Sequence, residues 1–389
     1  MAVAITGMGA LSALGRGTHV FFEALCSGRV GIRTAKEFAS EEYGVHVAAC
    51  VDTVGPGPRR ASLLAMEAAR EALGQARLDV PFAEEFAGRV AVVVGTTLGG
   101  ILGLLPRLRG DNVCVPMTFT HSGPAVDLAA ALGAEGPLVV PSVACASGTA
   151  AVGLGMELIR QGSADVALVG GVDALSDFVF AGFHSLGILD PDPARPFGHD
   201  RRGLTLGEGA AFLVLESEEH SAARGVSPLA LVTGHGLSDD ARHITGPDPE
   251  GKGAAQAMAA ALVDAGRTPA DVDFVNLHGT GTSFNDAMER HAMYALFGER
   301  AREVPVNSIK GVLGHTLGAA GAFEALLLAL VVQSGIIPPT VSTRELDPEI
   351  DLDVVLGAPR HAEVRVALST TSGFGGLNAA LVVERRSET

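Results

Sequence analysis

One cysteine stands where a thiol could act as a nucleophile. Cys145 lies in the segment VPSVACASGTAAVGLG, where an apolar run leads into a turn of small residues and then a Gly- and Ala-rich stretch. The pattern predicts a thiol at a helix N-terminus, where unpaired N–H groups and the helix dipole stabilise a thiolate and lower the thiol pKa. The same N–H groups could hold an oxyanion. A cysteine taken alone is nevertheless more often a small buried core residue.

Two histidines occupy similar glycine-rich corners. His278 follows an apolar run and precedes Gly-Thr-Gly-Thr, which predicts a turn at the edge of a sheet, where α/β folds bind ligands. His315, in the segment LGHTLGAAG, precedes another Gly- and Ala-rich helix. Either could act as a proton donor or acceptor, and either could instead be a structural histidine hydrogen-bonded within its turn.

Charged residues and one aromatic residue surround these corners in the sequence. Lys310 lies five residues before the second histidine, while Asp286 and Glu289 follow the first and share one face of a helix at i, i+3. Glu324 stands in an otherwise apolar helix, and Phe374 lies between glycines in GFGG. The charges could support the histidines or form surface ion pairs of little value. The phenylalanine could be a gate or a core side chain.

Alternating patterns predict the framework that positions these residues. Short apolar runs rich in β-branched residues alternate with Ala-rich stretches, which is typical of α/β layers with buried sheets. The region Leu189–Gly203, rich in Pro, Asp and Arg, is predicted to be a loop. The predicted strands are Val3–Thr6, Val90–Val94, Leu138–Pro141, Val166–Val169, Ala211–Leu215, Phe274–Leu277 and Leu381–Val383, and the predicted helices are Ala61–Gln75, Gly148–Gln161, Gly253–Ala265, Asp286–Phe297 and Ala319–Gln333.

A weak internal repeat relates the two halves of the chain. In each half a long helix leads to an apolar strand, and a second small-residue helix start follows, at 143–155 and at 310–321. The boundary between the halves falls near Ser221–Leu229. We expect the duplicated unit to bring the two loop-to-helix corners to one shared site.

Composition excludes several classes of protein. The 389 residues include 28 Lys and Arg against 44 Asp and Glu, a net charge of −16, which argues against nucleic-acid binding. Hydrophobic residues make up 47% and charged residues 19%, so a large core is expected. The cysteines at 26, 50 and 114 lack the setting of Cys145 and form no metal-binding CxxC motif, which favours a reduced, intracellular protein. The longest apolar run, Ala325–Val332, is too short to span a bilayer.

Taken together, the motifs resemble those of the elongating β-ketoacyl-acyl carrier protein synthases, condensing enzymes of the thiolase superfamily. The similarity extends over essentially the whole chain. It implies the α/β thiolase fold, with two similar halves, 1–225 and 226–389, in a five-layered αβαβα arrangement. The matching pieces are VACASG around Cys145, HGTGT at 278–282, the segment from Lys310 through GHTLGAAG to Glu324, GFGG at 373–376, GEGAAFLVLE at 207–216 and ARPFGHDRRG at 194–203.

The resemblance also implies a role for each site residue. Cys145 would accept an acyl group, and His278 and His315 would then bind malonyl thioester, assist the loss of CO₂ and stabilise the enolate, acting mainly after acyl transfer. The N–H groups of Cys145 and Phe374 would form an oxyanion hole, and Phe374 would gate access. Supporting charges are Lys310, Glu289 and Glu324, and the expected substrate contacts are Thr280, Thr282, Ser372 and Gly375.

The implied partners are acyl-loaded and malonyl-loaded acyl carrier protein and a second, identical or homologous subunit. Because carrier proteins are acidic, we expect a local basic docking patch, for which the candidates are Arg59, Arg60, Arg201 and Arg202. No cofactor, metal, nucleic acid or membrane partner is expected, and the expected compartment is the cytoplasm.

The resemblance leaves several related functions to be compared. The enzyme could serve fatty-acid synthesis or a specialised type II polyketide or aryl polyene pathway, in which a ketosynthase pairs with a chain-length factor. A non-catalytic chain-length factor is disfavoured because the nucleophile is present, a thiolase because no cysteine follows Cys145, and an initiating Cys–His–Asn synthase because there are two histidines. Ser372 replaces a phenylalanine usual in relatives, which predicts free space beside Phe374, and the segment Ile101–Thr120 is abbreviated.

Overall fold

The computed structural model describes residues 2–36, 43–111 and 119–386. The elements of the first half are β1 (Val3–Ser12), β2 (Gly15–Arg16), α1 (Thr18–Ser27), β3 (Arg33–Thr34), β4 (Val47–Ala48), α2 (Arg60–Gln75), α3 (Glu84–Ala87), β5 (Val90–Gly95), α4 (Ile101–Leu108), α5 (Gly123–Leu132), β6 (Leu138–Val139), α6 (Ser147–Arg160), β7 (Val166–Asp173), α7 (Asp177–Ser185), β8 (Gly209–Glu216) and α8 (Glu218–Ala223). Those of the second half are β9 (Ala230–Asp239), α9 (Lys252–Ala265), β10 (Phe274–Asn276), α10 (Ser283–Phe297), β11 (Pro305–Asn307), α11 (Lys310–Leu313), α12 (Ala320–Ser334), β12 (Ile336–Ile337), β13 (Asp353–Val354), β14 (Arg360–His361), β15 (Val366–Gly373) and β16 (Leu377–Glu384).

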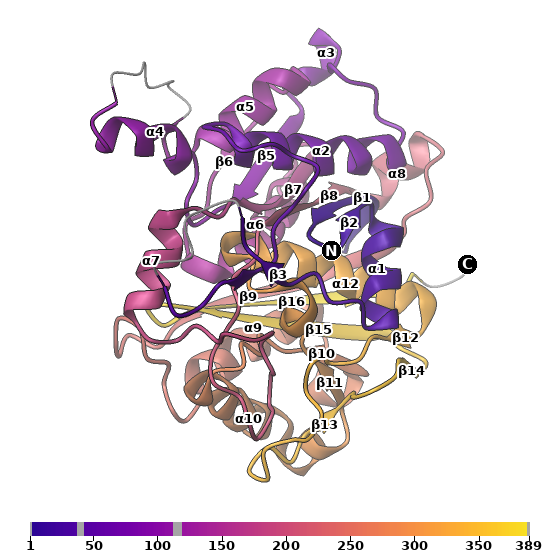
Figure 1. Cartoon of the computed structure of the whole chain (residues 1–389). Coiled ribbons are helices and arrows are strands. Elements are labelled where there is room, and N and C mark those ends of the chain that lie inside the picture. The colour runs from indigo at the N-terminus through magenta and orange to yellow at the C-terminus, as the bar shows by residue number, and fades with distance from the viewer. Residues whose placement is uncertain (1, 37–42, 112–118, 387–389) are drawn as a thin grey trace.

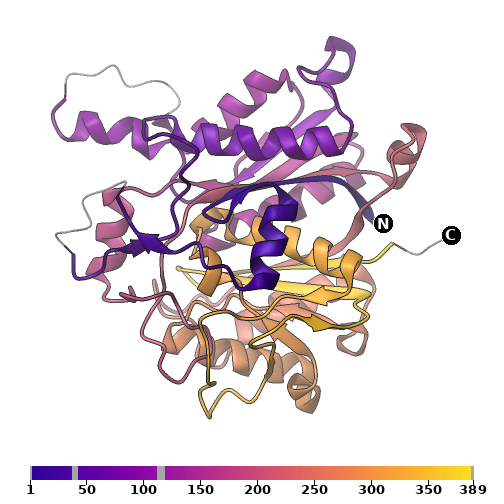
Figure 2. The same cartoon turned by 45° about the vertical axis from the view of Figure 1, so that its right-hand side comes forward.

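Helices and strands stack in alternating layers (Figure 1). Helices α2 and α5 cover the outer face of β1, β5, β7 and β8, and α9 and α10 lie beyond β9, β15 and β16 at the opposite side of the molecule. Helices α6 and α12 pack against each other between the two sets of strands, as the turned view in Figure 2 also shows. Three clusters of buried apolar side chains fill the spaces between these layers. The predicted five-layered α/β arrangement is therefore confirmed.

Twelve strands form one hydrogen-bonded path, in the order β13-β11-β10-β15-β16-β9-β1-β8-β7-β5-β6, with β2 attached to β1, while β3 pairs with β4 and β12 pairs with β14 in two small separate sheets. The two halves join where β1 pairs antiparallel with β9 over three residue pairs, from Val3↔Val232 to Ile5↔Ala230. Toward each end of the path the strands run parallel, β5 with β6 and β7, and β10 with β11 and β15. Their carboxyl ends supply loops to the middle of the molecule.

The central helix α12 is buried along almost its whole length. The stretch Leu317–Ser334 is long and apolar enough to cross a membrane by length and composition, but 83% of it is buried inside the protein. Its contacts with α6, β15 and β8 explain why it is apolar on all sides. The sequence argument from the short run Ala325–Val332 therefore underestimated this stretch, and burial is the better evidence that it is a core helix.

The five predicted helices are present, with boundaries that differ by at most three residues. Two long strands were missed, β9 and β15, because glycine and hydroxyl residues interrupt their apolar patterns. In β9 the glycines have a packing role, since a Cβ at Gly234 or Gly236 would lie 2.2 or 2.1 Å from a backbone oxygen of α9. The loop predicted at Leu189–Gly203 contains no helix or strand. Cys114 and residues 112–118 of the abbreviated segment lie outside the described residues.

Candidate active site

Cys145 lies in a tight 3₁₀ turn, Ala144–Ala146, directly before α6. Ala144 adopts a φ of 50°, which is uncommon for a residue with a side chain. Ser147 stabilises this turn, because its hydroxyl donates to the Ala144 carbonyl (2.6 Å) and accepts from Val143 N (3.0 Å). The predicted position of the thiol at a helix start is confirmed.

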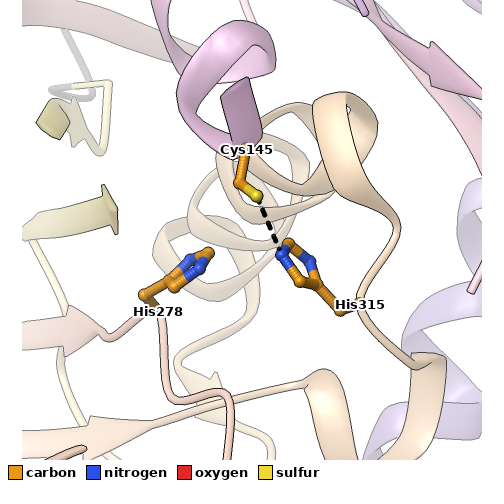
Figure 3. A group of neighbouring side chains, drawn as sticks. All are labelled: Cys145, His278 and His315. Atoms are coloured by element: carbon orange, nitrogen blue, oxygen red, sulfur yellow. Dashed lines mark hydrogen bonds between the residues drawn. The ribbon is translucent and has the colours of Figure 1, made fainter. Parts of the chain in front are cut away.

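The two histidines meet this thiol from the other half of the chain (Figure 3). His315 Nε2 lies 3.0 Å from Cys145 Sγ. The ring of His278 stands nearly perpendicular to that of His315, at 86°, with centroids 5.1 Å apart. Both histidines are 2% exposed and Cys145 is 7% exposed. The two loop-to-helix corners therefore form one shared site, as the internal repeat predicts.

The resting protonation state differs from the sequence expectation. Burial raises the pKa of the Cys145 thiol to about 12, although the nearby Lys310 acts in the opposite direction. Burial, together with the charge of Lys310, holds the pKa values of His278 and His315 well below the usual histidine value. The thiol is therefore protonated at rest and donates its hydrogen bond to a neutral imidazole. The expected lowering of the thiol pKa is wrong, because loss of solvation outweighs the stabilisation expected at a helix N-terminus.

Lys310 and Glu324 form a buried ion pair behind the histidines. Lys310 Nζ donates to Glu324 Oε1 at 2.6 Å, and the two side chains are 3% and 1% exposed. Thr371 Oγ1 donates to Glu324 Oε2 at 2.6 Å and lies 2.8 Å from Thr149 Oγ1. Because the Thr371 proton is used on the carboxylate, the Thr149 hydroxyl is the donor of that last bond. The chain of bonds ties the helix that carries Cys145 to the ion pair.

Glu289 and Asp286 hold the turn that carries His278. The carboxylate of Glu289 accepts from the backbone N–H groups of His278 (2.6 Å) and Gly279 (2.7 Å). Asp286 accepts from Phe197 N (2.7 Å) in the loop 189–203 and from Gly281 N (3.2 Å). Burial and the neighbouring Asp286 raise the pKa of Glu289 to about 8. The shared helix face predicted for these two acids faces the core rather than a surface ion pair.

The segment with the predicted gate lies against the nucleophile turn. A Cβ at Gly373 would lie 3.0 Å from Cys145 N, so the gate strand approaches the turn as closely as glycine allows. Phe374 is half-buried and stacks on Phe183 of α7, with ring centroids 5.8 Å apart. The hydroxyl of Ser372 donates to Asn378 Oδ1 at 2.7 Å. Phe183 is therefore a packing partner of Phe374 from another element, while the free space expected beside Ser372 stays a prediction.

The same glycine-rich segment is joined to the loop that follows β9. Gly375 N donates to the Ile244 carbonyl (2.9 Å). Asn378 Nδ2 donates to Asp240 Oδ1 (2.9 Å) and to the Gly376 carbonyl (2.9 Å). Two segments more than a hundred residues apart are thus held together by side-chain and backbone bonds at the gate.

The residues predicted to contact substrate differ in burial and in whether their hydroxyl groups are already hydrogen-bonded. Thr280 is buried, and its hydroxyl lies 2.8 Å from that of half-buried Thr282 at the start of α10. Gly375 is exposed and has a φ of 92°, a conformation that favours glycine. Ser372 is 9% exposed and its hydroxyl proton is already used on Asn378. Its predicted contact with substrate therefore has less structural support than those of the two threonines.

Two of the four predicted docking arginines are internal. Arg60 is 5% exposed and is paired with buried Glu208, and Arg201 is 8% exposed at its side chain and is paired with Asp347. Neither can present its charge to a partner, so the docking prediction is wrong for these two. Arg59 and Arg202 are exposed, at 59% and 52%, and both form ion pairs with aspartates.

Two clusters have the residue types of a metal site. Ligand atoms of Cys145, His278 and His315 lie within 4.8 Å of one another. The ammonium group of Lys310 is close enough to lower the pKa values of both histidines, and the same charge would repel a cation. Glu157, His235 and Asp264 form a second cluster, but the guanidinium of Arg160 bonds both of its carboxylates, at 2.8–2.9 Å. Both sets suit their present partners better than a metal ion.

Sequence reasoning missed several residues that contact this site. Thr149 is the fourth residue after Cys145 and therefore lies one helical turn further on. This spacing could have identified Thr149 from the sequence. Thr371 and Asn378 lie in or beside strands whose hydroxyl and amide side chains interrupt the apolar pattern. Buried polar residues within strands are the signal that could have identified them. Asp173, at the end of β7, had no motif around it.

Comparison with known proteins agrees with this geometry. Residues 58–221 match the family model of the β-ketoacyl synthase N-terminal domain, and residues 229–344 match that of the C-terminal domain. The tetracenomycin polyketide synthase ketoacyl synthase alpha subunit of Streptomyces glaucescens is 40% identical, over 100% of this chain and 98% of that protein. The 3-oxoacyl-[acyl-carrier-protein] synthase 2 of Staphylococcus aureus is 36% identical over 98% of each.

A solved structure gives the same result. The ishigamide ketosynthase/chain length factor superposes with a TM-score of 0.90 and 35% identity over 99% of both chains. The predicted thiolase fold and the predicted enzyme class are thus confirmed. The Cys–His–His site, the layered halves and these relatives together show that the chain belongs to the β-ketoacyl synthase family of carbon–carbon bond-forming acyltransferases.

Proposed function

We propose that this protein carries an acyl chain on Cys145 and condenses it with a malonyl group held on an acyl carrier protein. The observation that carries the proposal is the hydrogen bond between Cys145 Sγ and His315 Nε2, with the His278 ring set across it. A thiol, a neutral base and a second imidazole converge in one buried space. Thioester exchange followed by enolate formation needs such a set.

The first half-reaction is a transfer of the acyl group between two thiols. As Cys145 Sγ attacks the carrier thioester, its proton passes to His315 Nε2. The carrier sulfur then leaves and takes that proton as a thiol. The pKa of about 12 for the buried thiol means that ionisation must accompany the attack, which requires a base in contact. His315 therefore acts in acyl loading as well as in condensation, which revises the expectation that both histidines act afterwards.

The second half-reaction forms the carbon–carbon bond. Loss of CO₂ from malonyl thioester leaves its electron pair as an enolate, which His278 and His315 stabilise at the oxygen. The enolate carbon attacks the acyl carbonyl on Cys145, and the Cys145 sulfur leaves as a thiolate, which takes up a proton from solvent because its own proton left earlier on the carrier thiol. The N–H groups of Cys145 and Phe374 hold the oxyanion of this step, which the close approach at Gly373 supports.

The remaining residues support these steps. Burial lowers the pKa values of both histidines, and the positive charge of Lys310, paired with Glu324, lowers them further, so the rings are neutral at physiological pH. Glu289 fixes the His278 turn through two backbone bonds. Phe374 gates the site, and Thr280 and Thr282 contact the carrier's prosthetic arm.

We infer that the natural context is a specialised type II polyketide or polyene pathway, with a homologous chain-length factor as the second subunit. Relatives at 40% and 35% identity are a polyketide synthase alpha subunit and a ketosynthase/chain length factor, which supports this choice. The two halves are assigned to residues 1–225 and 226–389, and the proposed compartment is the cytoplasm. Fatty-acid elongation as a homodimer is the second candidate, supported by the 36% identical fatty-acid-type relative.

The experiment compares wild type with Cys145→Ala, His278→Ala and His315→Ala. Intact mass after incubation with acyl-carrier protein measures loading, and product mass after adding malonyl-carrier protein measures condensation. We expect no loading in Cys145→Ala, slowed loading in His315→Ala, and near-normal loading without condensation in His278→Ala. Equal loading of wild type and Cys145→Ala would refute the assignment. Purification with and without the homologous subunit, followed by mass photometry, separates the heterodimer from the homodimer.

A further inference from the structure

A buried carboxylate that the proposed chemistry does not use lies beneath the site. Asp173 ends β7 and is fully buried. Its Oδ1 accepts from Thr96 Oγ1 (2.7 Å) and Leu98 N (2.8 Å), and its Oδ2 accepts from Thr97 N (2.9 Å) and Gly318 N (2.7 Å). Three of these four donors are backbone N–H groups, which cannot accept a proton. Burial raises the pKa of Asp173, and these four bonds oppose that effect by favouring the ionised carboxylate.

The partners of Asp173 belong to both catalytic corners. Gly318 follows Leu317, which adopts a φ of 54° two residues after His315. Thr97, whose N–H binds Asp173, also donates its hydroxyl to the carbonyl of Ala144 (3.3 Å), the residue before Cys145. Cys145 and His315 thus each lie within two residues of a non-glycine residue with positive φ, and Asp173 bonds a residue that contacts or adjoins each of these, Thr97 and Gly318.

Such backbone conformations do not persist unaided. A left-handed conformation costs a residue with a side chain about 1 kcal/mol or more, and it is retained only where the surroundings impose it. The contact at Asp173 is also too close for any other residue at position 318. A Cβ at Gly318 would lie 2.7 Å from Asp173 Oδ2 and 2.6 Å from Thr97 N. Segments of both corners therefore contact the same carboxylate oxygen, Asp173 Oδ2, through Thr97 N and Gly318 N.

The charge of Asp173, considered alone, works against the nucleophile. After the larger effect of burial, Asp173 contributes to raising the pKa of the Cys145 thiol. A charge in this place hinders ionisation of the sulfur, so electrostatic activation does not account for it. The hydrogen bonds to the two corners remain as the contribution that favours catalysis.

We propose that Asp173 is a positioning residue, which keeps Cys145 and His315 at hydrogen-bonding distance by fixing the two strained corners beside them. The inference rests on the proposed function, because it assigns a use to the Cys145–His315 contact. Asp173 touches neither the sulfur nor the substrate, and it acts through Thr97 and Gly318.

The test is Asp173→Asn, which keeps the shape but replaces one acceptor oxygen by an amide that cannot accept a backbone N–H. Loss of the charge alone would favour the Cys145 thiolate, so reaction with iodoacetamide at fixed pH should be as fast as in wild type or faster. Loss of positioning should slow acyl loading from acyl-carrier protein by about tenfold or more. A destabilised protein would also expose the thiol and speed its alkylation, so the comparison is made only with a variant whose urea midpoint equals that of wild type.

The matched control is Glu216→Gln. Glu216 is another fully buried carboxylate, bonded to Arg224 and Thr6 at a distant end of β8. It should leave both rates unchanged, with folding monitored by circular dichroism. If Asp173→Asn does not fold, Thr97→Val removes only the hydroxyl bond to Ala144 and should slow loading by about threefold with unchanged alkylation.

Three results would overturn the proposal. They are loading within about twofold of wild type in folded Asp173→Asn, loading unchanged in Thr97→Val when that variant replaces it, or an equal loss in Glu216→Gln. A failure of the proposed function is distinct, because then wild-type Cys145 itself would not be acylated.

Discussion

Replacing Lys310 by methionine tests whether the buried ion pair supports both folding and the histidines. The attraction between Lys310 Nζ and Glu324 Oε1 at 2.6 Å amounts to about 6 kcal/mol at an effective dielectric constant of 20. Much of this is offset by the cost of removing both charges from water. In Lys310→Met the desolvation of Glu324 persists without its partner, since Thr371 alone remains bonded to it. We expect a loss of about 3–5 kcal/mol in the free energy of unfolding.

The double variant Lys310→Met/Glu324→Leu distinguishes the net contribution of the ion pair to stability from the cost of leaving one buried charge without a partner. Both charges are then absent, and the Thr371 hydroxyl can turn to Thr149 Oγ1, which lies 2.8 Å away. The double variant should therefore recover most of the lost stability, because apolar replacement of a buried pair is often neutral. Urea denaturation of the single and double variants measures both values.

An exposed pair provides the control. Lys252 and Glu250 are 67% and 68% exposed, and Lys252→Met should leave the urea midpoint unchanged. A midpoint for Lys310→Met equal to that of wild type would refute the reasoning, since the uncompensated carboxylate would then cost nothing. The stable double variant should also lose condensation at acid pH, because the charge of Lys310 no longer opposes protonation of His278 and His315.

The other two predictions concern the thiol and the gate. Because the pKa of Cys145 is about 12, its alkylation by iodoacetamide should rise about tenfold per pH unit from pH 7 to 10, measured against a Cys145→Ser background. A plateau below pH 9 would instead indicate a preformed thiolate. Asn378→Ala removes the bonds that join Ser372, Asp240 and Gly376, so the segment around Phe374 should become sensitive to limited proteolysis while the rest of the fold resists. Cleavage no faster than in wild type would show that these bonds do not hold the gate.

The helices and the paired corners could be predicted because their signals are local. Small residues after an apolar run mark the start of α6, and the same pattern marks the corner at His315. The repeat then suffices to place both corners at one site. Strand β15 could not be predicted from local signals, because its hydroxyl residues bond to partners far away in sequence, such as Thr371 to Glu324. Its polarity makes sense only once those partners are known.

The predictions of the Cys145 pKa and of the exposure of two arginines were also wrong, and both properties depend on burial. The lowered pKa expected for Cys145 took account of the helix N-terminus alone, whereas the thiol is enclosed and burial raises its pKa. The docking role of Arg60 and Arg201 assumed that charged residues lie at the surface. Arg60 instead pairs with the buried Glu208, and Arg201 pairs with the half-buried Asp347. A residue's type predicts its exposure only on average, and an internal partner for its charge is not visible in the sequence.

The glycine pattern at the two corners explains why nucleophile and base can come from different halves. Helices α6 and α12 cross where a Cβ at Gly148 would lie 2.6 Å from Ala322 N and one at Gly321 would lie 1.9 Å from Thr149 Oγ1. Larger residues at either position would separate the two helix starts. The helices approach closely enough that Cys145, two residues before α6, and His315, five residues before α12, share a hydrogen bond. The glycines that make the duplicated motif recognisable in the sequence are therefore the same ones whose small size allows the site to form.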